Sequence, residues 1–174
     1  ASRTNSMEPH ELLDICYHEA AHAVVAIAVG AQVNYVEIGK RPYKDMTSGG
    51  GCSWGSTHDL PWEEIYAIFA AGYVSDLLRG APKKRAHAQS EGDRLDMRAS
   101  LEERSGIFLS EKGREIRFTQ GVERASHILA KQDVETAWRR LAEELAAKVR
   151  AGSNRMLHIE VMKVVQPHLS KRAG

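Results

Sequence analysis

The chain of 174 residues is 43% hydrophobic and 27% charged, a composition typical of one folded domain with its own apolar core. Its 24 basic and 23 acidic side chains leave a net charge of +1, which argues against a nucleic-acid binder or a protein drawn to anionic membranes. The two cysteines, Cys16 and Cys52, stand far apart without a paired CxxC spacing. This argues against a disulfide scaffold and favours a reducing, cytoplasmic location.

The amino-terminal residues 1–7 are polar and lack the apolar core and cleavage pattern of a secretory signal. We expect them to be disordered, and we expect a single domain over residues 8–174 without an internal repeat. The longest uninterrupted apolar run, from Ala23 to Val29, is far shorter than the ~20 residues that a membrane-spanning helix needs. No membrane segment is therefore expected in this chain.

The first part of the chain predicts one helix followed by a small β element. Helix-forming residues from Pro9 to Val29, followed by Gly30, predict a helix that is apolar on most faces. Residues Val33 to Ile38 are rich in β-branched and aromatic side chains, and a glycine-rich turn separates them from Cys52 to Ser56. This pattern predicts a small hairpin or sheet edge.

The middle of the chain alternates between apolar periodicity and polar stretches. A second helix is predicted over residues 61–80, where apolar side chains recur at steps near 3.6. The polar and basic residues 82–92 are typical of a mobile surface loop. A third helical pattern follows, with Met97, Leu101 and Phe108 on one face.

The last part of the chain predicts a long helix and a short one. From about Val134 to Arg150, apolar side chains recur at spacings of four and three, which predicts a helix that packs on one side only. Residues 152–154 (Gly-Ser-Asn) break it, and a short helix is predicted from Ile159 to Val165. The residues between a charged turn around Gly113 and Val134 carry no element in this prediction. The fold class is therefore mainly α with a small β-hairpin or sheet element.

The residues His18-Glu19-Ala20-Ala21-His22 form an HExxH motif inside the most apolar predicted helix. Residues four apart on a helix lie one above the other, so both imidazoles can reach one metal ion about 2.0 to 2.1 Å from each nitrogen. Glu19 faces the same pocket and can accept a proton from water that the metal activates. A chance occurrence is disfavoured because buried His and Glu side chains without a partner are costly.

A catalytic zinc site takes three protein ligands and leaves one position for water, so a third ligand must come from farther along the chain. The HExxHxxGxxH pattern is absent because Val25 and Ala28 occupy its Gly and His positions. Glu63 and Glu64 are minor candidates for the third ligand. Both fit better as acidic partners of the dipole of the helix that they begin.

Three segments resemble the peptidase domain of the FtsH family, the AAA-linked zinc proteases. HEAAHAVV at 18–25 is similar to the family's HEAGHAVV, AGYVSDLLRG at 71–80 to its AGRxAEExxFG helix, and SEGDRLDMRAS at 90–100 to its TGAxxDLxxAT segment. The resemblance covers about residues 8–166 and implies a zinc metallopeptidase whose third ligand is an aspartate of the last segment. Ala21 replaces the family's glycine, and the sequence has no GxxxxGK[ST] motif, so no ATPase is encoded in these residues.

The last of these segments offers two aspartates, Asp93 and Asp96. Asp93 has Met97 and Leu101 four and eight residues later and so shares the core-facing stripe of its helix, whereas the residues at those distances from Asp96 are polar. This favours Asp93 as the third ligand. Counted from Gly92, however, the family's G-x-x-x-D spacing favours Asp96, so the alternative stays open.

The sequence therefore predicts a zinc metalloendopeptidase in which His18, His22 and Asp93 bind Zn²⁺ and Glu19 is the general base. Its substrate would be a peptide or an unfolded protein, with a separate ATPase or a second copy of the chain as candidate partners. By its resemblance to the family's edge strand, the segment 49–54 is a candidate for the strand beside which a substrate lies, although a flexible turn explains this glycine-rich segment equally well. The alternative is a non-catalytic interaction module that keeps the metal as a structural pin.

Overall fold

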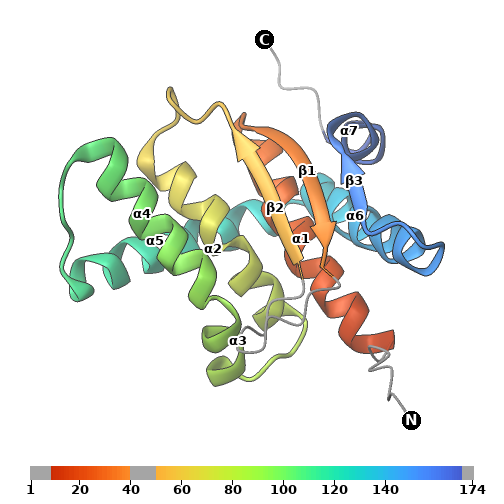
Figure 1. The fold of residues 1–174 in the computed structure, drawn as a ribbon, viewed down its shortest axis with the longest axis horizontal. Helices are drawn as coiled ribbons and strands as arrows, with labels where there is room; N and C mark the ends of the chain where they lie inside the picture. The colour runs from red at the N-terminus through yellow and green to blue at the C-terminus, as the bar shows by residue number, and fades with distance from the viewer. Residues whose placement is uncertain (1–8, 40–49, 170–174) are drawn as a thin grey trace.

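The computed structural model describes residues 9–39 and 50–169, and these form a mainly helical domain with a small antiparallel sheet, as predicted (Figure 1). The expectation of disorder for residues 1–7 lies outside the described residues. The elements follow one another as α1 (Pro9–Val29), β1 (Gln32–Ile38), β2 (Gly50–Gly55), α2 (Trp62–Leu78), α3 (Lys83–Gln89), α4 (Glu91–Ser105), α5 (Glu111–Leu129), α6 (Gln132–Arg150), β3 (Arg155–Leu157) and α7 (His158–Val165).

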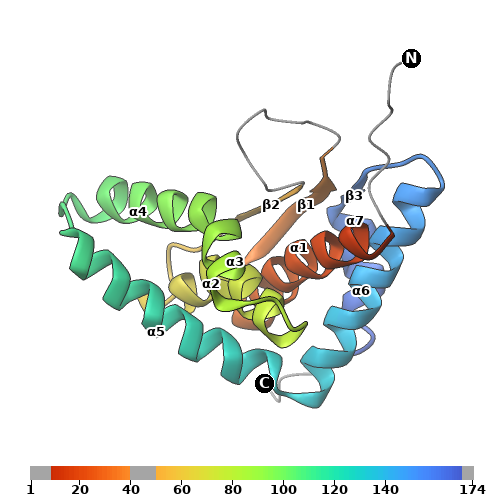
Figure 2. The same ribbon diagram turned by 90° about the horizontal axis from the view of Figure 1, so that it is seen from below.

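Helix α1 is the central element of the domain. It packs against α2 and α6, while β1 and β2 cover a further side of it (Figures 1 and 2). Every residue from 18 to 26 is buried, and most of them are alanines and valines whose small side chains allow neighbouring elements to come close. The predicted helix from Pro9 to Val29 is confirmed, and its centre lies in the core.

By length and composition alone, α1 is also apolar enough to cross a membrane, and it is the one such helix within the described residues. Most of that stretch, from His10 to Val29, is buried against other parts of the domain. A core helix passes the same test of length and composition. The expectation that no segment spans a membrane therefore stays a prediction.

The sheet has the order β2-β1-β3, so β2 is an edge strand. The predicted hairpin is confirmed, because β1 and β2 pair antiparallel with Val36 opposite Cys52. Strand β3 pairs antiparallel with the other side of β1, and this pairing was not predicted. With only three residues, β3 is too short to show a period in the sequence.

The prediction of a mobile loop over residues 82–92 is wrong, because α3 and the start of α4 occupy this segment. Pro82 stands at the N-cap of α3 with its φ at −57°, and it is followed by strong helix formers. Polar composition indicated the exposure of these side chains correctly. It said nothing about the backbone, which here is helical.

Two further differences concern α4 and α5. Met97 and Leu101 are buried on α4 as predicted, but Phe108 lies beyond the end of the helix and is 73% exposed. Helix α4 ends at Ser105 and is capped by Gly106, whose φ of +66° lies in the left-handed region that favours glycine. Helix α5 was missed, and its N-cap is Ser110, whose hydroxyl accepts a hydrogen bond from the backbone N–H of Gly113.

Candidate metal centre

Two elements far apart in the sequence bring three ligand atoms together. Helix α1 presents His18 and His22 on one face, with their Nε2 atoms 3.3 Å apart. Oδ2 of Asp93, in the first turn of α4, lies 3.3 Å from Nε2 of His18 and 3.2 Å from Nε2 of His22. The structure thus assembles the three residues that the sequence predicted as ligands, and these could hold a metal ion.

The spacing of the three atoms suits a tetrahedral ion. Ligands about 2.0 to 2.1 Å from a zinc ion at tetrahedral angles stand roughly 3.3 to 3.4 Å apart. The three observed separations, 3.3, 3.3 and 3.2 Å, lie close to that value. Two imidazoles and one carboxylate are a donor set that zinc takes in catalytic sites, with a fourth position left for water.

The other ring nitrogen of each histidine is held by an acceptor. Nδ1 of His18 lies 3.1 and 3.0 Å from the two carboxylate oxygens of Asp76, and Nδ1 of His22 lies 2.6 Å from the backbone oxygen of Ile68. Since a carbonyl oxygen and a carboxylate only accept, this network assigns the hydrogen of each neutral imidazole to Nδ1. The lone pairs of both Nε2 atoms therefore face the carboxylate of Asp93, and a cation between them would satisfy all three groups.

The pKa values of these groups show the same preference for positive charge. Burial opposes protonation of His18, but its hydrogen bonds with Asp76 and Asp93 outweigh burial and raise its pKa well above the usual value. Burial likewise opposes protonation of His22, and the charge of Asp93 raises its pKa. Burial would raise the pKa of Asp93, yet the two histidines hold it well below its usual range. The surroundings of these atoms thus favour a cation at their centre.

Glu19 follows His18 directly on α1 and lies beside this cluster. Its side chain is buried, and within the described residues no hydrogen bond to its carboxylate is present. Burial raises the pKa of Glu19, while the charges of His18 and His22 act to lower it. A carboxyl group with a raised pKa beside a metal centre is suited to accept and release a proton.

Two residues of α2 that shape the site were not singled out from the sequence. Asp76 orients His18, and Gly72 lies so close to both imidazoles that a Cβ atom there would stand 2.3 Å from Nε2 of His18 and 2.6 Å from Nε2 of His22. Only glycine leaves room for the histidine pair. The available signals were an acidic residue and a glycine within an otherwise apolar helix.

The edge strand β2 forms one side of the site. The ring of Trp54 stacks on His22 with 5.8 Å between ring centroids and 22° between planes. At the other end of the strand, a Cβ atom on Gly50 would stand 2.8 Å from Cγ of Glu19. Both ends of β2 therefore contact residues of the HExxH motif.

The structure places the remaining candidate residues away from the three ligand atoms. Asp96 is exposed and is not part of the group, so the geometry favours Asp93 as the candidate third ligand. Glu63 is exposed, and Glu64 forms an ion pair with Arg124 at 2.7 Å. Neither glutamate belongs to the group that could hold an ion.

A comparison of the sequence with models of known protein families finds no match, and a comparison with curated proteins finds no significant match.

Proposed function

We propose that this protein is a zinc-dependent metalloendopeptidase that hydrolyses peptide bonds. The observation that carries the proposal is the convergence of His18, His22 and Asp93 on one point, with the buried carboxylate of Glu19 beside it. The resemblance of the three sequence segments to the FtsH peptidase domain supports the same activity. Peptides or unfolded proteins are the proposed substrates.

His18, His22 and Asp93 would hold the ion, and Asp76 would keep His18 in the tautomer that binds it. Bound zinc supplies a Lewis acid that polarises the peptide carbonyl and acidifies water at its open position. Glu19 would take a proton from the attacking water and pass it to the amine that leaves when the C–N bond breaks. The products are a carboxylate and an amine, so the reaction needs no co-reactant besides water.

Strand β2 is the proposed place for the substrate backbone. It is one of the two edge strands of the sheet, and Gly50 brings it against Glu19. An extended peptide added along an open sheet edge gains backbone hydrogen bonds that do not depend on its side chains. This mode fits the proposed unfolded substrates. The proposed partners are a separate ATPase, which would deliver unfolded substrate chains to this site, or further copies of this protein in a homo-oligomer.

The test compares Glu19→Gln with the wild type on a fluorogenic peptide mixture and an unfolded protein, with metal content measured on the same samples. We expect kcat/KM to fall by about 10²- to 10⁴-fold while the bound metal is retained, because the variant keeps the ligands and loses the proton acceptor. Glu63→Gln is the matched control, since Glu63 is an exposed glutamate outside the site.

Two outcomes would contradict the proposal. A zinc-loaded wild type that cleaves none of these substrates would favour the non-catalytic module with a structural metal. Equal hydrolysis by the wild type and Glu19→Gln would show that the activity does not come from this site.

A further inference from the structure

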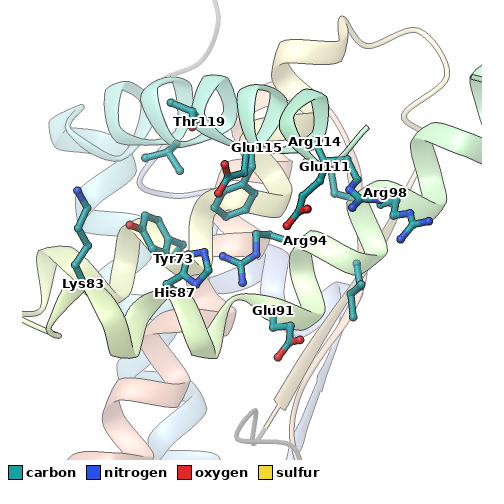
Figure 3. Close-up of a pocket in the computed structure, with 14 residues that line it drawn as sticks. Tyr73, Lys83, His87, Glu91, Arg94, Arg98, Glu111, Arg114, Glu115 and Thr119 are labelled. Carbon is teal, nitrogen blue, oxygen red and sulfur yellow. The ribbon is translucent and has the colours of Figure 1, made fainter. Parts of the chain in front are cut away.

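A cavity of about 460 Å³ lies between α3, α4 and α5, and Tyr73 of α2 also lines it (Figure 3). None of the three candidate metal ligands lines it. Its volume is in the range of pockets that bind small molecules, roughly 300 to 1,000 Å³. The cavity is therefore separate from the candidate metal centre.

The deep part of this cavity is apolar. Tyr73 and Phe118 meet there edge to face, with 5.7 Å between their ring centroids. Met97 also lines the cavity and is 1% exposed. Such a surface suits a large apolar side chain rather than a bare inorganic ion.

A guanidinium group with an unused donor stands next to this apolar surface. Nη1 of Arg94 is buried and has no hydrogen-bond partner within the described residues. The guanidinium carbon lies 5.8 Å from the centre of the Phe118 ring, and Figure 3 shows the group directed into the space between α4 and α5. A carboxylate is the ligand group that best matches the planar donors of an arginine.

Opposite Arg94, helix α5 contributes carboxylates. Glu111 and Glu115 line the cavity and are directed into the same space in Figure 3. Among the ion pairs of the described residues, none includes either glutamate. Both glutamates are exposed, and Lys83 and Arg114 also line the cavity, so its opening carries both signs of charge. Such a lining suits a ligand that carries a carboxylate and an ammonium group better than a simple anion.

We propose that this cavity binds a small zwitterion, namely a free α-amino acid or dipeptide with a large apolar side chain. Its carboxylate would contact Arg94, its ammonium group would face Glu111 and Glu115, and its side chain would lie on Phe118 and Tyr73. The inference goes beyond the proposed hydrolysis and does not depend on it.

The test is calorimetric titration of the metal-loaded protein with L-phenylalanine and two analogues that each lack one charge. N-acetyl-L-phenylalanine has no ammonium group, and L-phenylalanine amide has no carboxylate. We expect saturable binding of L-phenylalanine and at least about tenfold weaker binding of each analogue, because each analogue lacks one of the two charged groups that the cavity would contact.

Two variants locate the binding, and a third is the control. Arg94→Met removes the guanidinium, and Thr119→Trp fills the cavity from an exposed position on α5 that is remote in sequence from Asp93. Both are expected to weaken L-phenylalanine binding at least about tenfold with the helix content and metal content unchanged. Arg140→Met, which changes an exposed arginine on α6, should bind like the wild type.

Three results would overturn the proposal. L-phenylalanine could fail to bind at millimolar concentration. N-acetyl-L-phenylalanine could bind as tightly as L-phenylalanine, which would show that no ammonium group is recognised. Binding could persist in Thr119→Trp and Arg94→Met and disappear when the metal is removed, which would show chelation at the metal centre. Because hydrolysis is not measured, none of these results bears on the proposed function.

Discussion

The hydrogen-bond acceptor at each Nδ1 atom decides that the lone pair of each histidine lies on Nε2. Nδ1 of His18 is held by the carboxylate of Asp76, and Nδ1 of His22 is held by the backbone oxygen of Ile68. The backbone acceptor is present whatever the side chain at position 68. The carboxylate at position 76 depends on one residue, so it can be tested by substitution.

Asp76→Ala is expected to weaken metal binding about 10- to 100-fold while the fold is retained, because His18 loses the group that fixes its tautomer and ring orientation. The measurement is zinc affinity by competition with a chromophoric chelator. Asp14→Ala is the control: Asp14 is 46% exposed and pairs with Arg79 on the outside of α1. Equal affinity in Asp76→Ala and the wild type would contradict the role given to Asp76.

Gly72→Ala is expected to abolish metal binding, because its Cβ atom would stand 2.3 Å from Nε2 of His18 and force the imidazole aside. Metal content per chain is the readout, with circular dichroism to follow the helices. Gly51→Ala is the matched control, since a Cβ atom there would meet nothing within 4 Å. A metal-loaded Gly72→Ala protein would show that the two histidines do not meet as described.

At this scale the sequence predicts the HExxH residues because the spacing of four places two side chains on one helix face. It also favours Asp93 through the apolar stripe that this residue shares with Met97. Asp76 and Gly72 escaped prediction because their roles arise only where α2 crosses α1. The local sequence does not predict how closely these two helices approach each other.

Among the elements, α2 and α5 make one of the closest contacts of the domain. A Cβ atom on Gly121 of α5 would stand 2.4 Å from the backbone oxygen of Tyr66 on α2. Backbone atoms cannot move aside to relieve such a clash as the end of a flexible side chain can. The glycine therefore sets the distance between the two helices.

Gly121→Ala is expected to lower the stability of the domain by about 1 to 3 kcal/mol, because the two helices must move apart. By thermal unfolding this corresponds to a fall in Tm of roughly 2 to 12 °C. Gly113→Ala on the same helix is the control, since the atoms nearest to its Cβ atom would belong to the side chains of Ser110 and Leu109, at 3.2 Å or more. A Tm for Gly121→Ala equal to that of the control would contradict the close approach.

Elements with a clear apolar period were predicted, and those without one were missed. Helix α6 shows the period plainly through Val134, Trp138, Leu141 and Leu145, all of which are buried. In α5 two of the buried positions are Gly121 and Ala125, whose small side chains carry little hydrophobic signal although they lie at the contact.

At the scale of the whole molecule, the candidate metal centre joins α1 in the core to α4 at the side of the domain (Figure 2). Helix α4 buries only Met97 and Leu101 among its apolar residues. A metal held by Asp93 would therefore be a major attachment of α4 to the core. The mainly α fold class could be predicted from composition and periodicity, but this tertiary link could not.

Removal of the metal with a chelator is expected to lower the Tm, because a ligand that binds only the folded state stabilises it. With free zinc at 100 times its Kd the stabilisation is about 2.7 kcal/mol, which corresponds to roughly 5 to 11 °C. Differential scanning calorimetry with and without chelator measures the shift, and added zinc should reverse it. Asp93→Ala should show no such response, and a wild-type Tm indifferent to chelator and zinc would contradict the expectation.

The most direct test of the metal centre is elemental analysis of the purified wild type, Asp93→Ala and Asp96→Ala. We expect about one zinc per chain in the wild type and in Asp96→Ala, and almost none in Asp93→Ala. Asp96 is the matched control because it is an exposed aspartate of the same helix. A folded wild type that stays metal-free when zinc is offered, or a loss of zinc in Asp96→Ala alone, would contradict the account.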